Sequence, residues 1–185
     1  MVPTPLLRDC REGDLEAVRV IYAREVLEGT ASFELEPPDL AELTARWRAI
    51  RSARLPYVVA EQGGRIAGYA YAGPYRARPG YRYTVENSVY VAPWARRRGV
   101  GRVLLDRVIT AASDRGMRQM VAIIGDSEHV ASIALHDGAG FRLVGVLGNV
   151  GCKFGRWLDT VIMQRALGEG AASLPPEGVA PSCSG

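Results

Sequence analysis

One stretch, residues 83–101, holds the residues whose types and spacing are best suited to chemistry. Within it, Arg96, Gly99 and Gly101 form an Arg-x-x-Gly-x-Gly pattern after the segment Val-Tyr-Val. Glycine lets the backbone approach a ligand closely, and a helix that begins there points unpaired N–H groups toward that ligand. Such a helix end suits a phosphate or a pyrophosphate. A turn before a surface helix, with solvated arginines, would explain the same residues without any ligand.

This pattern resembles the acyl-coenzyme A loop of the Gcn5-related N-acetyltransferases. Further segments are similar to the phosphinothricin and methionine sulfoximine acetyltransferases within that superfamily. They are Thr-Val-Glu-Asn-Ser-Val-Tyr-Val at 84–91, Ala-Leu-His at 134–136 and Gly-Cys-Lys-Phe-Gly-Arg-Trp-Leu-Asp at 151–159. The similarity extends from about Leu7 to Leu167, which is nearly the whole chain.

The resemblance implies acetyl-coenzyme A (acetyl-CoA) as co-substrate. Backbone N–H groups of the glycine turn would grip the pyrophosphate, and the exposed backbone of residues 89–91 would pair with the pantetheine amides like an added strand. His129 stands where many relatives have an asparagine that contacts the pantetheine arm, and an imidazole can also donate or accept a hydrogen bond. The cofactor-binding candidates are therefore Val89, Tyr90, Val91, Arg96, Arg97, Arg98, Gly99, Val100, Gly101, Arg102 and His129.

The resemblance assigns catalysis to Glu86 and His136. Glu86 would take the proton from the substrate ammonium group, directly or through water, and partial burial would raise its pKa and make it a better base. A surface carboxylate paired with an arginine is the alternative interpretation. His136 would face the substrate, whereas a core histidine bonded to backbone is its alternative. The spacing of His129 and His136 is not that of a convincing metal pair, and we expect no metal.

Two loops supply the candidates for acceptor binding. In the family resembled, the loop at residues 30–34 forms a wall of the substrate pocket, although Phe33 could simply anchor that loop in the core. The loop at residues 73–82 carries arginines whose planar guanidinium groups suit a carboxylate or a phosphinate. Its Tyr-Arg pair matches the aromatic and basic residues that line the family's amino-acid site, and a merely solvated connection is the alternative. The substrate-binding candidates are Phe33, Glu34, Tyr75, Arg76, Arg78 and Tyr83.

The elements that must position these residues can be predicted from local patterns. Residues 84–91 alternate as a half-buried strand, with the valines on one face and Glu86, Ser88 and Tyr90 on the other. Gly63-Gly64 joins the strands 57–61 and 66–72 in a hairpin, and Asp14 is the expected N-cap of the first helix. We expect further strands at 6–9, 119–124, 143–147 and 158–164, with residues 151–156 forming a loop.

This order predicts an α/β fold, that of a single-domain acetyltransferase of the family resembled. It would have a mixed central sheet of about seven strands flanked by about four helices, with a splayed strand pair at the cofactor site. The domain would span residues 1–167, and the Ala, Ser, Pro and Gly content of residues 168–185 predicts a disordered tail.

Composition excludes several other classes. A chain of 185 residues with 48% hydrophobic content fits one domain. Its net charge is only +3, and its basic residues do not cluster into the stripe that a nucleic-acid-binding protein would need. The three cysteines, Cys10, Cys152 and Cys183, lack metal or redox spacing and favour a reducing compartment. No signal peptide or membrane span is visible, so we expect a cytoplasmic protein without a membrane partner.

We therefore expect an acetyl-CoA-dependent N-acetyltransferase. The acceptor would be the α-amino group of a small amino-acid analogue, such as phosphinothricin, methionine sulfoximine or methionine sulfone, and transfer would be direct. Another small amine, an amino acid or a protein N-terminus is the alternative acceptor. A coenzyme A sensor without turnover is the alternative from a different class. The resemblance also implies a homodimer.

Overall fold

The computed structural model describes residues 4–175 and contains one seven-stranded sheet with the order β1-β2-β3-β4-β5-β7-β6. The strands are β1 (Leu6–Asp9), β2 (Tyr57–Gln62), β3 (Arg65–Pro74), β4 (Thr84–Val91), β5 (Gln119–Gly125), β6 (Arg142–Lys153) and β7 (Arg156–Ala166). The helices are α1 (Leu15–Glu28), α2 (Leu40–Ser52), α3 (Val100–Asp114) and α4 (Val130–Gly138). Short 3-10 turns occupy Glu12–Asp14, Pro79–Tyr81 and Pro93–Ala95. The predicted mixed α/β sheet with four α-helices is confirmed for the described residues.

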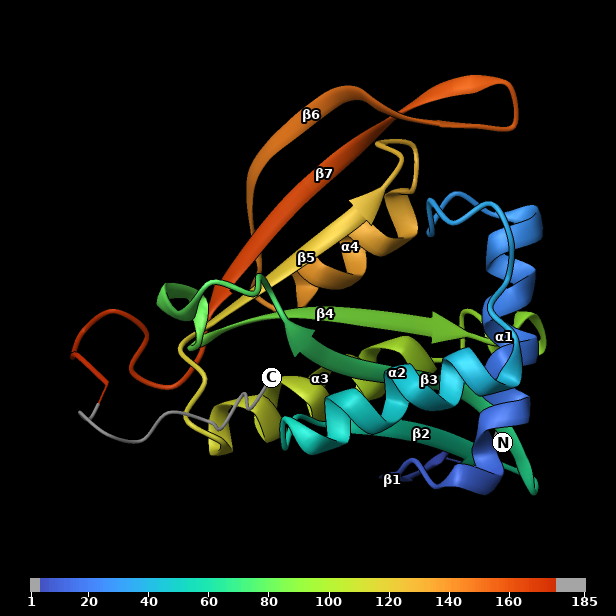
Figure 1. Cartoon of the computed structure of the whole chain (residues 1–185), viewed down its shortest axis with the longest axis horizontal. Helices are drawn as coiled ribbons and strands as arrows, with labels where there is room; N and C mark the ends of the chain where they lie inside the picture. The colour runs from blue at the N-terminus through green and yellow to red at the C-terminus, as the bar shows by residue number, and fades with distance from the viewer. Residues whose placement is uncertain (1–3, 176–185) are drawn as a thin grey trace.

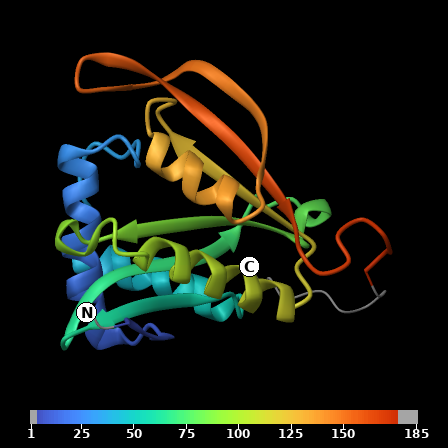
Figure 2. The same cartoon turned by 180° about the vertical axis from the view of Figure 1, so that it is seen from behind.

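The helices cover both faces of the sheet. Figure 1 shows α1 and α2 in front of it, and Figure 2 shows α3 and α4 on the opposite face. Successive strand residues point to opposite faces, so Val58 packs in the cluster with α3 whereas Val59 packs in the cluster with α1 and α2. Burial on both faces explains why much of β3 and β5 reads as a nearly continuous apolar run.

The sheet opens between its two central parallel strands. The pairing of β4 with β5 begins at Thr84 with Gln119 and ends at Asn87 with Ala122, although both strands continue further. Beyond that point β4 follows β3, up to the pair of Val91 with Gly68, whereas β5 follows β7. The outer part of β4 therefore has no strand partner on this side, and the predicted splay is confirmed.

The local predictions around the first hairpin are also confirmed. Gly63 and Gly64 join β2 and β3 with φ values of 59° and 72°, which are left-handed conformations that glycine adopts without strain. The loop after β3 begins later than expected, because β3 continues through Pro74, and the turn Pro79–Tyr81 gives part of this loop regular structure.

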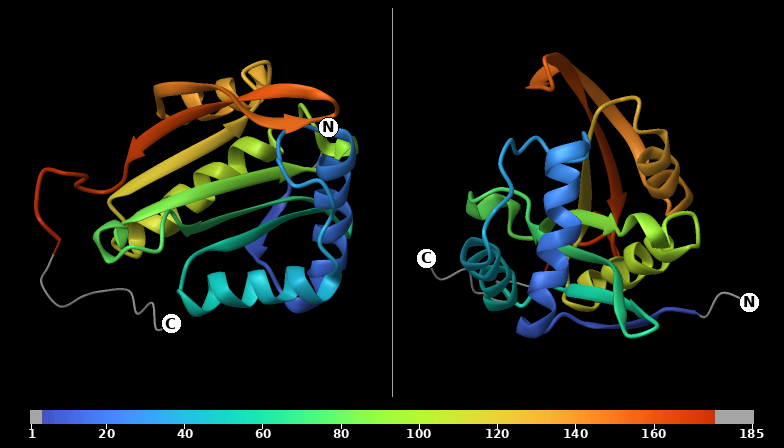
Figure 3. Two further views of the ribbon diagram at one scale, coloured as in Figure 1. Left: turned by 45° about the horizontal axis from the view of Figure 1, so that its top comes forward. Right: turned by 90° about the vertical axis from the view of Figure 1, so that its right-hand side faces the viewer.

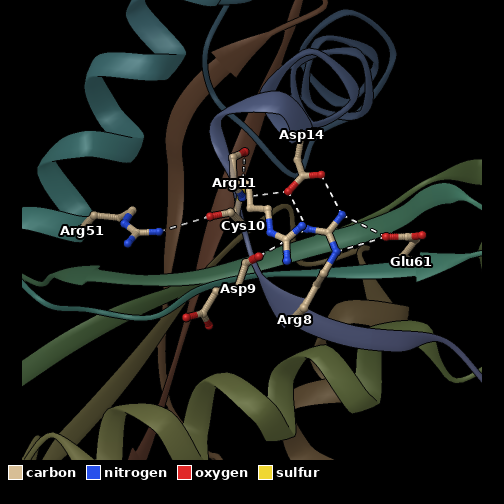
Figure 4. A network of polar contacts seen from close by, with 7 residues as sticks. All are labelled: Arg8, Asp9, Cys10, Arg11, Asp14, Arg51 and Glu61. Carbon is tan, nitrogen blue, oxygen red and sulfur yellow. Dashed lines mark hydrogen bonds and ion pairs between the residues drawn. The ribbon is translucent and has the colours of Figure 1, made fainter.

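Asp14 stands at the predicted N-cap position of α1, but its side chain accepts no hydrogen bond from that helix. Its backbone is already helical, because a 3-10 turn precedes α1. Instead its carboxylate accepts two hydrogen bonds from Arg8, at 2.6 and 2.8 Å, and one from the Arg11 backbone N–H (Figure 4). Arg8 also contacts Glu61, so this network joins β1, the turn before α1 and β2.

The C-terminal hairpin differs from its prediction as well. Residues 151–153 belong to β6 rather than to a loop, and only Phe154 and Gly155 form the turn, with φ values of 53° and 71°. Figure 3 shows this long hairpin reaching past the rest of the sheet, over the end of α1. Of the predicted tail, residues 168–173 form turns against Arg118, and residues 176–185 lie outside the described part of the chain.

Candidate active site

A groove of about 490 Å³ lies at the open edge of β4. Its walls come from the end of β4, the turn that follows, the start of α3 and the start of α4. The candidates that line it are Val89, Tyr90, Val91, Arg96, Arg97, Gly99, Val100, Gly101, Arg102 and His129. Of the cofactor-binding candidates, only Arg98 is not among the lining residues. Sequence reasoning missed Glu25, Ala31, Ala131, Ser132 and Leu135, which also line the groove and carry no local chemical signature.

The first turn of α3 presents free backbone donors to this groove. Gly99 occupies the N-cap position with φ 81°, and no side chain caps the helix. The first N–H groups of an α-helix have no partner within the helix, and the helix dipole adds partial positive charge at the same place. Arg97 precedes this cap in a left-handed conformation, with φ 59°. The turn is therefore built to bind an anion with its backbone.

The arginine side chains around this turn have different tasks. Arg96 pairs with Glu25 of α1 and donates from Nε to the Val91 carbonyl at 3.3 Å. Arg102 contacts Asp106 at 2.7 Å and donates to the Gly138 carbonyl at 2.6 Å, which ties α3 to the end of α4. Arg97 and Arg98 are exposed and form no ion pair within residues 4–175. Arg96 and Arg102 are thus structural supports, and the backbone is the main candidate for ligand binding.

Glu86 lies half-buried on β4, opposite Gly73 of β3 and Val121 of β5. Burial raises the pKa of its carboxyl group, and the positive charge of Arg76 opposes that shift. In the described part of the chain no ion pair includes Glu86, so the alternative of a salt-bridged surface carboxylate does not describe it. A carboxylate with a raised pKa and no bound cation is suited to accept a proton.

The side chains near Glu86 include aromatic and charged groups that the sequence did not single out. Tyr71 is partly buried on β3; burial and the charges of Glu86 and Glu34 raise its pKa, whereas a hydrogen bond with Ser88 and the charge of Arg46 oppose that shift. Arg46 of α2 contacts Glu34 at 2.6 Å. Glu34, a candidate for binding the acceptor, is therefore already paired with an arginine. Tyr71 and Arg46 could be found only from the packing of α2 and β3 against β4.

The remaining acceptor candidates lie on two segments. The Arg76 guanidinium lies 5.1 Å from the centre of the Tyr75 ring, and Arg82 covers Tyr83 in the same way at 4.9 Å. Arg78 is exposed. The Phe33 ring packs against the backbone of Gly125 and Gly151, at the ends of β5 and β6. The charge of Arg76 therefore acts on Glu86, whereas Phe33 lies at the ends of β5 and β6.

His136 is buried in α4, with 4% of its surface exposed. Its Nδ1 donates to the Ser132 carbonyl at 2.8 Å, and its Nε2 accepts from the Asn87 side-chain amide at 2.9 Å. Burial lowers the pKa of the imidazole, so the ring is neutral with the proton on Nδ1. The structure therefore has the backbone-bonded histidine that the sequence left as an alternative, and it links this histidine to β4.

A narrow cavity of about 50 Å³ follows the wedge between β4 and β5. Asn87, His129 and His136 are among its lining residues. Asn87 Oδ1 and His129 Nδ1 are buried there without a hydrogen-bond partner in the described structure. Buried polar atoms normally have partners, so these two atoms mark a place where a ligand or water completes the site.

No group of three or more His, Cys, Asp or Glu side chains in residues 4–175 could hold a metal ion. Among the same residues, no helix has the length and apolar character needed to cross a membrane.

The fold and the groove define a class of protein that binds a long, phosphate-bearing ligand along an open strand edge. The chain belongs to the acetyltransferase (GNAT) family, whose model matches residues 19–141. It is 51% identical to a phosphinothricin N-acetyltransferase of Alcaligenes faecalis, over 91% of this chain and 86% of that protein. It is 40% identical to an L-methionine sulfoximine/L-methionine sulfone acetyltransferase of Salmonella typhimurium, over 90% of this chain and 96% of that protein.

A solved structure is similar over almost the whole length. It is a phosphinothricin acetyltransferase from Sinorhizobium meliloti in complex with acetyl-CoA, with a TM-score of 0.94 and 46% identity. The match covers 97% of this chain and 97% of the other. The family resemblance seen in the sequence is thereby confirmed, and so is the fold that it implied.

Proposed function

We propose that this protein transfers the acetyl group of acetyl-CoA to the α-amino group of a small amino-acid analogue. Phosphinothricin, methionine sulfoximine and methionine sulfone are the acceptors that the named relatives support. The observation that carries the proposal is the unpaired edge of β4 beyond Asn87, beside the uncapped start of α3.

The donor fits these two features. The N–H groups of Val100, Gly101 and Arg102 would bind the pyrophosphate, and the backbone of β4 would pair with the pantetheine amides. The buried, unpartnered Nδ1 of His129 lies at the wall of both the groove and the wedge cavity. It is suited to the polar contact that many relatives make with an asparagine. The donor supplies an activated acyl group, and the backbone N–H near Val89 would stabilise charge on its carbonyl oxygen.

Glu86 is the proposed general base. The acceptor arrives as an ammonium ion, and its nitrogen becomes a nucleophile only after a proton leaves. The raised pKa of Glu86 brings this carboxylate closer to the pKa of the group that it must deprotonate. The amine nitrogen then attacks the acetyl carbonyl in a ternary complex, the thioester C–S bond breaks as the amide forms, and coenzyme A leaves as its thiolate, with no covalent intermediate on the protein.

His136 serves the same site through Asn87. Both of its ring nitrogens are engaged by protein atoms, so in this arrangement it holds the Asn87 amide in place at the wedge. A direct catalytic role, as the resemblance implies, would require the ring to exchange Asn87 for a reacting group.

Recognition of the acceptor's acidic group is assigned to the segment after β3. Arg76 is exposed, stacked on Tyr75 and electrostatically coupled to Glu86, so it could hold a carboxylate or a phosphinate beside the base. Arg78 and Tyr83 are further candidates on the same segment, and Phe33 and Glu34 would form the opposite wall.

A cytoplasmic homodimer is the proposed state of the protein. β6 is an edge strand of the sheet and exposes a row of apolar side chains, a combination that usually marks a contact surface. These side chains are Leu143, Val144, Val146, Leu147 and Val150.

Thiol release from acetyl-CoA, measured with a panel of acceptors, tests the proposed reaction. The panel contains phosphinothricin, methionine sulfoximine, methionine sulfone, the standard amino acids and spermidine. Turnover confined to the first three supports the proposal. Turnover only on other amines would refute the proposed acceptors but would still support acetyl transfer from acetyl-CoA to an amine. Tight acetyl-CoA binding without any turnover would instead support a coenzyme A sensor.

A further inference from the structure

A buried lysine lies at the end of β6, outside the groove described above. Lys153 has 3% of its surface exposed, and Nζ donates to the Gly29 carbonyl at 2.9 Å and to the Ser32 carbonyl at 2.6 Å. The same ammonium group lies 5.1 Å from the centre of the Phe154 ring. Burial lowers the pKa of Lys153, and the negative charges of Glu25 and Glu34 oppose that shift.

The position of this charge indicates a specific task. Burying an ammonium group is unfavourable unless hydrogen bonds replace its water, and an apolar side chain could fill the same space without that penalty. The two carbonyl groups that accept hydrogen bonds from Lys153 belong to the segment after α1, which has no regular secondary structure. Lys153 therefore connects the tip of the β6–β7 hairpin to this segment across 121 and 124 residues of sequence.

A second contact between the same two parts is independent of the charge. The Phe33 ring lies so close to the backbone of Gly151 that a Cβ atom there would be 2.5 Å from the ring. Gly125, at the end of β5, approaches the same ring, and a Cβ atom there would lie 3.0 Å away. Real Cβ atoms do not approach carbon atoms to 2.5 Å, so an alanine at position 151 must displace the ring.

Other elements also support this segment, and Thr30 hydrogen-bonds to the Asp126 side chain after β5. Ser32 shares a hydrogen bond of 2.9 Å with the Tyr22 hydroxyl, and Glu34 pairs with Arg46. In Figure 1 the turn of the β6–β7 hairpin lies above this segment at the top of α1, where the other views also place it. The hairpin is thus, together with the end of β5, a part of the sheet that determines where Phe33 lies.

We propose that Lys153 and Gly151 are positioning residues that hold the Phe33 wall and thereby set which acceptors fit. The proposal rests on the proposed function, in which Phe33 lines the acceptor pocket. The uncapped helix and the open β4 edge belong to other elements, and the tethered segment contributes Ala31 alone to the lining of the groove, so these two residues should affect acetyl-CoA binding less than acceptor binding. The hairpin tip is then a determinant of acceptor specificity.

The variants Lys153→Met and Gly151→Ala test this proposal, with Gly13→Ala as the control. Gly13 lies in the turn before α1, away from the hairpin, and a Cβ atom there would meet nothing within 4 Å. Losing two hydrogen bonds to a charged group should raise the acceptor KM by about tenfold in Lys153→Met. Gly151→Ala should raise it as well, whereas the acetyl-CoA KM should change less in both and Gly13→Ala should match the parent.

Amide hydrogen exchange in the protein without substrates supplies a second readout. Residues 30–35 should exchange faster in Lys153→Met than in the parent, and the amides of β4 should not change. Unchanged exchange in that segment together with an unchanged acceptor KM overturns the proposal, and so does an equal loss of acetyl-CoA affinity. If Lys153→Met fails to fold, the comparison of Gly151→Ala with Gly13→Ala decides the question. A parent without any acceptor turnover refutes the proposed function, yet the exchange measurement still tests the tether.

Discussion

The side-chain amide of Asn87 on β4 donates a hydrogen bond of 2.9 Å to Nε2 of His136 on α4. Asn87 is the last residue of β4 that pairs with β5, so this bond lies at the point where the sheet opens. It determines the tautomer of the histidine, because Nε2 must be unprotonated to accept. Several measurable properties follow from this arrangement and from its neighbours.

The neutral state of His136 should make folding depend on pH. Burial and the nearby His129 lower its pKa in the folded protein, whereas in the unfolded chain it titrates near its ordinary value of about 6.5. The unfolded state therefore binds more protons below that pH, and stability should fall as the pH drops from 7.5 to 5.5. His136→Gln, which offers Asn87 an acceptor but does not titrate, should show a smaller loss. Urea unfolding at both pH values measures the difference, and equal pH slopes would contradict it.

Removing the proposed base should abolish most turnover at neutral pH. Glu86→Gln should lower kcat by about a hundredfold or more, because a positioned base contributes that much, and should leave acetyl-CoA binding intact. In the parent, kcat/KM should fall as the pH drops through the raised pKa of Glu86, because the protonated carboxyl cannot accept a proton. Glu16→Gln, at an exposed ion pair on α1, is the control. Full turnover by Glu86→Gln with the parent's pH profile would refute the assignment.

The conformation of Gly99 should matter for the donor and not for the acceptor. An alanine at φ 81° is strained by about 1–2 kcal/mol and would move the first N–H groups of α3. We expect Gly99→Ala to weaken acetyl-CoA binding by about tenfold, measured by titration calorimetry. Gly64→Ala has a similar backbone strain, with φ 72°, at the distant β2–β3 turn. It should lose comparable stability but keep its affinity, and a loss of affinity in both variants would mean that the effect is not local.

The exposed face of β6 should hold the proposed dimer together. Val146 is 49% exposed on this edge strand, and Val146→Glu would place a charge in the contact. Light scattering at micromolar concentration should give a dimer for the parent and a monomer for the variant. Val20→Glu changes a residue of similar exposure, 58%, on α1 and should remain dimeric. A parent that is already monomeric would refute the homodimer.

Local sequence determined the features that depend on neighbouring residues. Thr84 to Val91 forms a strand because its side chains alternate between the two faces of the sheet, each of which packs against an apolar cluster. Gly63-Gly64 forms a tight hairpin because both residues adopt positive φ. The glycine turn before α3 was recognisable for the same reason. The splay of β4 from β5 was predictable only through the family resemblance, since no pattern within either strand announces where pairing ends.

Tertiary structure decided the partners of the polar side chains. Asp14 has the sequence context of a helix cap, yet its carboxylate pairs with the Arg8 guanidinium of β1, which also pairs with Glu61 of β2. Lys153 was predicted to lie in a loop, but it is buried at a strand end, where it binds carbonyls far away in the sequence. Propensity and periodicity act over a few residues. The burial of Glu86, the Asn87–His136 bond and the Lys153 tether depend on which distant elements pack together.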